Sequence, residues 1–337
     1  MSKRIALAFV VVVLLSAGLL FVRPPQARAV YTISPILLIH GWNANSALDC
    51  NGTWGTVRDY LLGHGMTTVR SLGFYLGDSH CDQYVLDNGN CSNWYNGNFG
   101  TVNEDIRHTT CNIAWWIWNN YTQYGTTVGV IAHSMGGILI RQILNDTAWV
   151  HPTFPPYLKI WDVATAGSPH QGLASATAGA AALGSYIGVG GCWSPCLELG
   201  QMEKYNPLMS NMNSQTWRNG TARNPQGDGG TDWTTITSAY DDLFTYACLN
   251  TNERMGAPSP VGQLSACGLM PGAKHFVHYP GPGFAPYYNH GDYLVDTNTA
   301  WDADECYSDN TGGVWSCVYN SEHSIFTMHY AMLYSSW

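Results

Sequence analysis

The amino-acid sequence predicts an α/β protein built on a doubly wound, mostly parallel β-sheet. Segment 35–39 is short and continuously apolar, which is typical of a parallel strand buried on both faces, and further strand-like runs follow at 126–131, 158–164 and 233–239. They alternate with helical segments: the β-type run 126–131 is followed by the helical run 137–144. We expect residues 30–337 to form a single domain around this sheet.

The first 29 residues have the composition of a secretory signal peptide. Lys3 and Arg4 precede an apolar run over 5–22, and residues 27–29 (Ala-Arg-Ala) fit a small-residue cleavage site. A run of about 18 apolar residues is also long enough to span a membrane, so a membrane anchor is the alternative. We expect cleavage after residue 29, no stable membrane anchor afterwards, and a secreted, extracellular protein.

The cysteines support export to an oxidising compartment. All ten lie beyond the predicted cleavage site, and an even number suits disulfide bonds. Their spacing suggests three local pairs: Cys192 with Cys196, Cys248 with Cys267, and Cys306 with Cys317. A zinc site at the first of these pairs is disfavoured, because no second ligand pair follows at the usual spacing.

Charge excludes two classes of partner. The predicted signal peptide contains four of the 14 Lys and Arg residues and none of the 23 Asp and Glu residues, so the mature chain has a net charge of about −13. An acidic surface repels phosphate backbones and anionic membranes, so no nucleic-acid partner is expected. The glycine-rich segments also lack the motifs that bind nucleotide phosphates.

One serine stands where an apolar run meets a helical segment, in the stretch 130–137 that reads VIAHSMGG. A sharp turn between a strand and a helix exposes a serine hydroxyl for nucleophilic attack. The small residues that this turn needs are Ala132 and Gly136, although the common pattern has glycine at both positions. We therefore expect Ser134 to be a nucleophile and the Met135 amide, at the start of the helix, to face the oxygen of a reacting carbonyl.

A second amide is needed to stabilise that oxygen. The apolar run 35–39 is followed by His40 and Gly41, which form a tight turn at the end of another predicted strand. We expect the Trp42 N–H to supply the second hydrogen bond, with the Asn43 N–H as the alternative. An apolar strand that ends in His-Gly upstream of the serine motif is a more specific signal than the motif alone.

These segments resemble the secreted bacterial lipases and esterases of the α/β-hydrolase superfamily, in particular the small lipases whose serine turn reads A-H-S-M-G. The resemblance covers segments 35–41, 128–144, 166–172 and 234–243 of the mature chain. It implies an α/β-hydrolase fold, a Ser-Asp-His triad in that chain order, and neither a cofactor nor a metal.

The resemblance also points to the acid of the triad. Segment 238–244 (SAYDDLF) resembles the family's acid motif and places the acid at Asp241, with Asp242 as the alternative. The roughly sixty residues between the strand-like runs 158–164 and 233–239 are rich in Gly and Ala and show no strand pattern. We expect them to form an excursion that carries disulfide cysteines and covers one edge of the site.

The histidine base is expected a few residues after the family's last strand, which segment 271–279 resembles. His290 is the preferred candidate, and His323 is the rival because it also precedes a helix-like segment. We expect His275 and His278 to have packing or surface roles within the strand. His133, inside the serine motif, is expected to pack beside the nucleophile.

The sequence thus predicts a secreted, monomeric serine hydrolase that cleaves carboxylic esters, either a triacylglycerol lipase or a carboxylesterase. Its substrates would be small-molecule, lipid or polyester esters. A cutinase-like polyester hydrolase is the nearest alternative, and amidase or peptidase chemistry uses the same triad. An alternative of another class is a non-catalytic secreted binding protein on a hydrolase scaffold.

Overall fold

The structure is a computed structural model, and its compact unit Ile33–Trp337 is the part considered below. The described residues are 34–173, 196–214, 231–238, 241, 254–255, 264–265, 275–279, 290–297, 301–308 and 315–333. The predicted signal peptide, 1–29, lies outside them and stays a prediction. Within the described ranges, no helix has both the length and the apolar character needed to cross a membrane.

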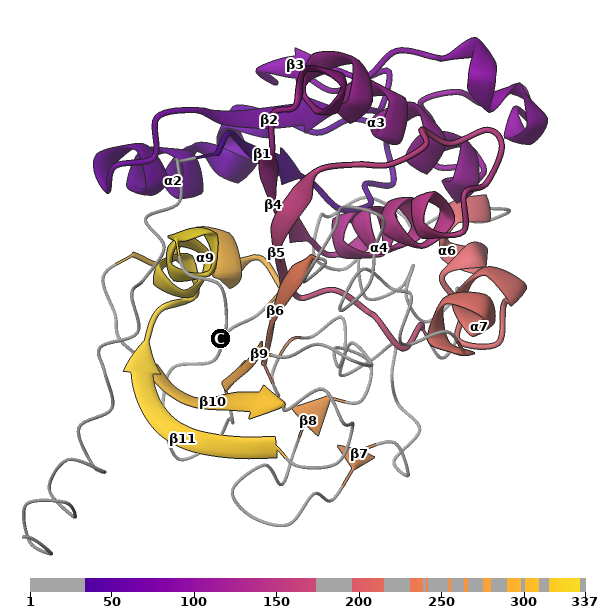
Figure 1. Ribbon diagram of the computed structural model, residues 1–337. Helices are drawn as coiled ribbons and strands as arrows, with labels where there is room; N and C mark the ends of the chain where they lie inside the picture. Colours follow the sequence, from indigo (N-terminus) through magenta and orange to yellow (C-terminus); the bar gives the residue numbers. More distant parts are fainter. Residues whose placement is uncertain are drawn as a thin grey trace, which may run out of the picture. The chain divides into compact units, whose positions relative to one another are not determined.

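A nine-stranded sheet organises the described part of the chain, in the order β11-β10-β9-β6-β5-β4-β1-β2-β3 (Figure 1). Its strands are β1 (Ile36–Ile39), β2 (Val69–Gly73), β3 (Gln83–Tyr84), β4 (Val128–His133), β5 (Ile160–Ala166), β6 (Asp232–Ser238), β9 (His275–Tyr279), β10 (Trp301–Ser308) and β11 (Trp315–Glu322). The seven strands from β3 to β9 in this order are all parallel, whereas β10 and β11 add an antiparallel edge. The short strands β7 (Arg254–Met255) and β8 (Leu264–Ser265) pair separately.

Helices cover both faces of the sheet (Figure 1). The α-helices are α2 (Cys50–Gly63), α3 (Ile106–Asn120), α4 (Met135–Ala148), α6 (Leu197–Gln201), α7 (Pro207–Ser214) and α9 (Ser324–Leu333), and the 3-10 helices are η1 (Gly89–Trp94), η2 (Thr122–Tyr124) and η4 (Asp292–Leu294). Helices α3 and α4 pack in one hydrophobic cluster together with α6 and α7, and α2 and α9 pack in the other. The predicted doubly wound, mostly parallel sheet is confirmed.

The continuous apolar run of β1 follows from this two-sided cover. Leu37 and Ile39 pack in the cluster under α3 and α4, whereas Ile36 and Leu38 pack in the cluster under α2 and α9. Successive side chains of a strand point to opposite faces, so a strand covered on both sides must be apolar at every position. All four side chains are at most 1% exposed.

The start of α3 differs from what its sequence predicts. Residues 101–104 (Thr-Val-Asn-Glu) have the spacing of a capping box, which predicts that Thr101 and Glu104 cap the helix. The N-cap is Asp105, whose side chain accepts a hydrogen bond of 2.8 Å from the Arg107 N–H. Glu104 instead turns back and accepts a hydrogen bond from the Gly100 N–H, in the turn that precedes the helix. The capping prediction was wrong because an aspartate one residue later satisfies the same free N–H groups.

Disulfides tie together the segments around β2 and α3. The structure contains Cys50–Cys81 and Cys91–Cys111, and Cys196 is also disulfide-bonded. Of the predicted local pairs, Cys192, Cys248 and Cys267 lie outside the described residues. The register of β10 and β11 places the backbones of Cys306 and Cys317 directly opposite each other.

His278 makes the stability of the fold depend on pH. Complete burial in β9 lowers the pKa of His278 from its usual 6.5 to about 4. Because the unfolded chain takes up the proton more readily, this histidine's contribution to stability is present above pH 6.5 and is lost as the pH falls toward 4. A change of this size corresponds to about 3 kcal/mol of unfolding free energy.

We therefore expect the stability difference between the native protein and His278→Gln to shrink by about 3 kcal/mol between pH 7 and pH 4. Urea unfolding of both proteins across this range, with disulfides intact, measures the difference. Parallel stability curves for the two proteins would contradict the prediction.

Candidate active site

Ser134 is held in a strained turn between β4 and α4. Its backbone angles are φ 56° and ψ −128°, a region that costs a residue with a side chain about 1–3 kcal/mol. The Ser134 N–H donates to the Ala166 carbonyl at the end of β5 (2.9 Å), and α4 begins at the next residue, Met135. This geometry places the serine at the carboxyl edge of the sheet, where α/β folds hold their ligands.

The turn after β1 lies directly against the serine. A Cβ atom added to Gly41 would come within 2.5 Å of the Ser134 Cβ and 3.0 Å of its Oγ. A Cβ added to Gly136 would clash with the backbone carbonyls of Ile39 and His40. The two glycines therefore allow the ends of β1 and β4 to touch, because neither position has room for a side chain.

The two candidate amides on this turn differ in their surroundings. Asn43 is half-buried, and its Oδ1 accepts a hydrogen bond from the Asn45 N–H (2.9 Å). Tyr75, a buried residue that follows β2, contacts the ring of His40 on the same turn, and its hydroxyl donates to Glu198 Oε2 on α6 (2.6 Å). The neighbouring residue Trp42 is only 6% exposed and packs in the cluster under α3 and α4.

Asp241 and His290, which are 49 residues apart in the sequence, meet at the same edge of the sheet. Asp241 follows β6 and His290 precedes η4. His290 Nδ1 lies 3.1 Å and 3.0 Å from the two carboxylate oxygens of Asp241. An Nδ1–H that donates to a carboxylate fixes the ring orientation and leaves Nε2 as the basic atom of the neutral imidazole.

Gly167 and Tyr293 border this pair. Gly167, at the end of β5, has φ +58°, and a Cβ there would lie 3.0 Å from Asp241 Oδ2 and 3.2 Å from His290 Nδ1. Burial and the Asp241 carboxylate raise the pKa of Tyr293 well above its usual value, so the phenol stays protonated beside the acid. Ser134, Gly167 and Asp241 thus follow three neighbouring parallel strands, β4, β5 and β6.

His133 connects the serine turn to His290. Its Nε2 lies 2.6 Å from the His290 carbonyl oxygen, and the two rings are 4.6 Å apart. Burial, together with the nearby His290, holds the pKa of His133 well below its usual value. The neutral ring therefore donates Nε2–H to the backbone of His290. This contact places His290 next to the turn that carries Ser134.

The other histidine candidates lie elsewhere. His323 precedes α9, accepts a hydrogen bond from the Phe326 N–H, and contacts the ring of Tyr60 edge-on. His275 bonds to Thr234 and Glu305 within the sheet, while His278 contacts Thr237. Asp242, the alternative acid, lies outside the described residues.

The sequence pattern did not reveal the support around His290. Nothing in the residue spacing indicated that Gly167 needs its glycine or that His133 binds the His290 backbone. Tyr293 offered one signal, since it is only three positions after the preferred base. As for metals, the described ranges hold no group of three or more His, Cys, Asp or Glu side chains arranged to bind an ion.

No protein-family model and no curated protein sequence matches the chain. Similar solved structures include phospholipase PlaB from Legionella pneumophila, with 15% identity and a TM-score of 0.42 over 64% of this chain and 42% of the phospholipase. Lipase BlEst2 from Bacillus licheniformis is similar at 15% identity and TM-score 0.38, over 65% of this chain and 69% of the lipase. The metagenomic carboxyl esterase MGS0156 is similar at 11% identity and TM-score 0.43, over 85% of this chain and 72% of the esterase. At these values the activity has to be argued from the site itself.

The contact between the two turns gives a test that is independent of activity. We expect Gly41→Ala to lower the free energy of unfolding by about 1–3 kcal/mol, because the new methyl group overlaps Ser134. Gly63→Ala is the matched control: its Cβ meets nothing within 4 Å, and alanine should stabilise the end of α2 by up to about 1 kcal/mol. Urea unfolding of the two variants measures both effects, and equal stabilities would contradict the close contact.

Proposed function

We propose that this protein is a secreted serine hydrolase that cleaves carboxylic esters, a lipase or carboxylesterase. The observation that carries the proposal is the hydrogen-bonded Asp241–His290 pair beside the strained Ser134, all three at the carboxyl edge of the parallel sheet. A nucleophile, a base and a group that orients the base are the minimum set for acyl transfer through a covalent intermediate.

The first half of the reaction forms an acyl-enzyme. His290 Nε2 takes the proton of the Ser134 hydroxyl while Oγ attacks the ester carbonyl carbon. The resulting imidazolium then gives this proton to the leaving alcohol as the carbon–oxygen bond breaks. Asp241 stabilises the imidazolium through its hydrogen bonds to Nδ1. In the second half, water takes the place of the alcohol, and the carboxylic acid leaves Ser134.

The tetrahedral intermediate needs hydrogen-bond donors for its negatively charged oxygen. We assign these to the backbone N–H groups of Trp42 and Met135. The close approach of Gly41 to Ser134 supports a donor from the β1 turn, and Trp42 is the residue that directly follows Gly41. Met135 is the first residue of α4, so its N–H has no partner within the helix.

The cysteines and the N-terminal residues indicate the compartment in which the proposed enzyme acts. Disulfides at Cys50–Cys81 and Cys91–Cys111 favour an oxidising compartment. Together with the signal-peptide pattern of residues 1–29, they support export. The proposed protein acts outside the cell as a monomer on small-molecule, lipid or polyester esters, without a cofactor.

Substitutions in the proposed triad should abolish ester hydrolysis while the protein stays folded. We expect Ser134→Ala to reduce kcat on nitrophenyl butyrate by about 10⁴-fold or more, and Asp241→Asn to reduce it by about 10⁴-fold. His290→Gln should be as inactive as Ser134→Ala, because residues that act as a unit are not additive. Steady-state kinetics on the purified chain, with circular dichroism as the folding check, measures these losses.

His323→Gln is the matched control for the base. It removes a half-buried histidine that lies beside Tyr60, so kcat should stay within about twofold of the native value. Full activity in His290→Gln together with loss in His323→Gln would transfer the role of the base to the rival residue.

A substrate series separates the remaining functions. Nitrophenyl esters with acyl chains of increasing length distinguish an esterase from a lipase, and a polyester film tests cutinase-like activity. A matched anilide tests amide cleavage. Absence of turnover on all of these substrates, with no reaction of Ser134 toward a fluorophosphonate, would favour a binding protein on a hydrolase scaffold.

A further inference from the structure

Asp78 is a buried carboxylate that is used entirely for hydrogen bonds within the protein. Its Oδ1 accepts from the Leu48 N–H (2.9 Å), and its Oδ2 accepts from the N–H groups of Phe74 and Tyr75 (both 2.8 Å). Oδ2 also lies 2.9 Å from His40 Nε2, and both side chains of this pair are fully buried. Four donors around one carboxylate fix its position closely.

His40 links Asp78 to the turn that lies beside Ser134. Its ring stacks on Phe74, with centroids 3.9 Å apart, and its Nδ1 lies 2.8 Å from the Gly41 carbonyl oxygen. Each ring nitrogen therefore faces an oxygen of a different group, the Asp78 carboxylate on one side and the Gly41 carbonyl on the other. The Gly41 carbonyl is therefore held by a ring that Asp78 in turn holds.

Peptide geometry links this carbonyl to the proposed oxyanion donor. The Gly41 carbonyl and the Trp42 N–H belong to one planar trans peptide, so they point in opposite directions. A hydrogen bond that fixes the carbonyl on one side consequently fixes the N–H on the other. Because the Gly41 Cα abuts Ser134, the direction of this peptide decides whether the Trp42 N–H faces the reacting carbonyl.

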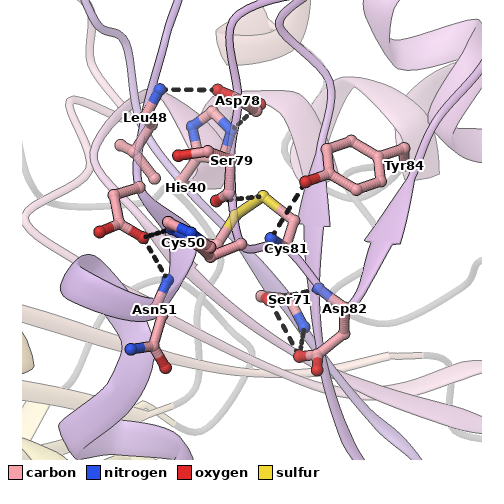
Figure 2. Close-up of a disulfide and its surroundings, with 12 residues drawn as sticks. His40, Leu48, Cys50, Asn51, Ser71, Asp78, Ser79, Cys81, Asp82 and Tyr84 are labelled. Carbon is pink, nitrogen blue, oxygen red and sulfur yellow. Dashed lines mark hydrogen bonds and ion pairs between the residues drawn. A yellow bond between two sulfur atoms is a disulfide. The ribbon is translucent and has the colours of Figure 1, made fainter.

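A disulfide holds the segment that carries Asp78. The Cys50–Cys81 disulfide, drawn in Figure 2, joins the two segments just after the parallel bridge between Asp49 and Ser79. Next to it, the Ser79 N–H donates to the Leu48 carbonyl, and the Cys50 N–H donates to the Ser79 carbonyl. The cross-link thus fastens together the two segments from which Asp78 and its Leu48 partner come.

We propose that Asp78 and His40 are positioning residues for the oxyanion hole, which hold the Gly41–Trp42 peptide so that the Trp42 N–H faces the reacting carbonyl, and that the Cys50–Cys81 disulfide braces them. The inference rests on the proposed hydrolase function. Neither residue touches the substrate; both act through the direction of one peptide.

Asp78→Asn tests the relay with almost no change in volume. The neutral asparagine amide offers the His40 ring a weaker hydrogen-bond partner than the carboxylate does. The ring is then held less firmly and no longer fixes the Gly41 carbonyl. The Gly41–Trp42 peptide can rotate, and the intermediate loses one of its two donors.

We expect Asp78→Asn to lower kcat by about tenfold to a hundredfold with KM within about twofold, because the Trp42 donor is displaced while the Met135 donor remains. His40→Phe keeps the stack on Phe74 but lacks the Nδ1–H, so it should show the same loss. The double variant should lose no more than either single variant, since both act on the same peptide. Rates are expressed per active site, counted by complete labelling of Ser134 with a fluorophosphonate.

Controls distinguish positioning from folding. Asp82 lies close by and also accepts two hydrogen bonds, from the N–H and hydroxyl of Ser71, but it has no link to His40 (Figure 2). Asp82→Asn should keep kcat per labelled site. Likewise, replacing Cys50 and Cys81 by alanine should lower kcat per site severalfold, whereas replacing Cys91 and Cys111 by alanine should lower only the thermal stability.

The results distinguish failure of the positioning role from failure of the proposed hydrolase function. If the native protein hydrolyses esters and Asp78→Asn and His40→Phe keep native kcat per labelled site, the positioning role is wrong and the hydrolase stands. Additive losses in the double variant would also overturn the relay. If the native protein neither turns over esters nor reacts with the fluorophosphonate, the proposed function fails first.

Discussion

The contact between the turn after β1 and the turn after β4 is the constraint on which the site depends. At this point two backbones approach so closely that neither Gly41 nor Gly136 has room for a methyl group. Such proximity requires neighbouring parallel strands of matched length, and β1 and β4 are paired in register along their whole shared length. The strained backbone of Ser134 persists because this packing and the bond from its N–H to Ala166 leave it no relaxed alternative.

Several buried polar groups lie together at the same edge of the sheet. Burying them without hydrogen-bond partners would lower the free energy of unfolding. Asp241, His133 and His290 are all nearly or completely buried, and each has a hydrogen-bond partner that the fold supplies. Burial keeps the His133 ring neutral, so it serves as a fixed donor and not as a second charge beside His290. The site thus combines the Asp241 carboxylate and its histidine partner with neutral supports, which suits a reaction that develops charge only transiently.

The loops around Asp78 and the Cys50–Cys81 disulfide hold this edge of the sheet in place but contribute no side chains to the proposed reaction. The loop between β1 and α2 and the loop that follows β2 meet next to the Cys50–Cys81 disulfide, and the Asp78 carboxylate accepts hydrogen bonds from backbone N–H groups of both loops. A small group of charge-assisted hydrogen bonds therefore determines the shape of a loop that has little regular structure. Tyr75 contacts the ring of His40 and donates its hydroxyl hydrogen to Glu198 on α6, which links this turn to that helix.

Much of the architecture could be predicted from local patterns. The strand-like runs of β1, β4, β5 and β6 predicted the parallel strands, and the helical run after β4 predicted α4. The pattern missed α2, β2 and β10, whose sequences are too mixed in polarity to show a period, as in Val69–Gly73 with its exposed arginine. It also misplaced the cap of α3, because Thr101, Glu104 and Asp105 compete to satisfy the same free N–H groups.

The sequence by itself determined the sheet, the serine on its turn and the short list of acids and histidines to consider, because these depend on neighbours within a few residues. Only the tertiary structure decided which distant groups meet. Asp241 joins His290 across 49 residues, His40 joins Asp78 across 38, and Cys50 joins Cys81 across 31. The local pattern of apolar and polar residues does not predict such pairings. They arise when parallel strands bring the ends of separate segments to one edge of the sheet.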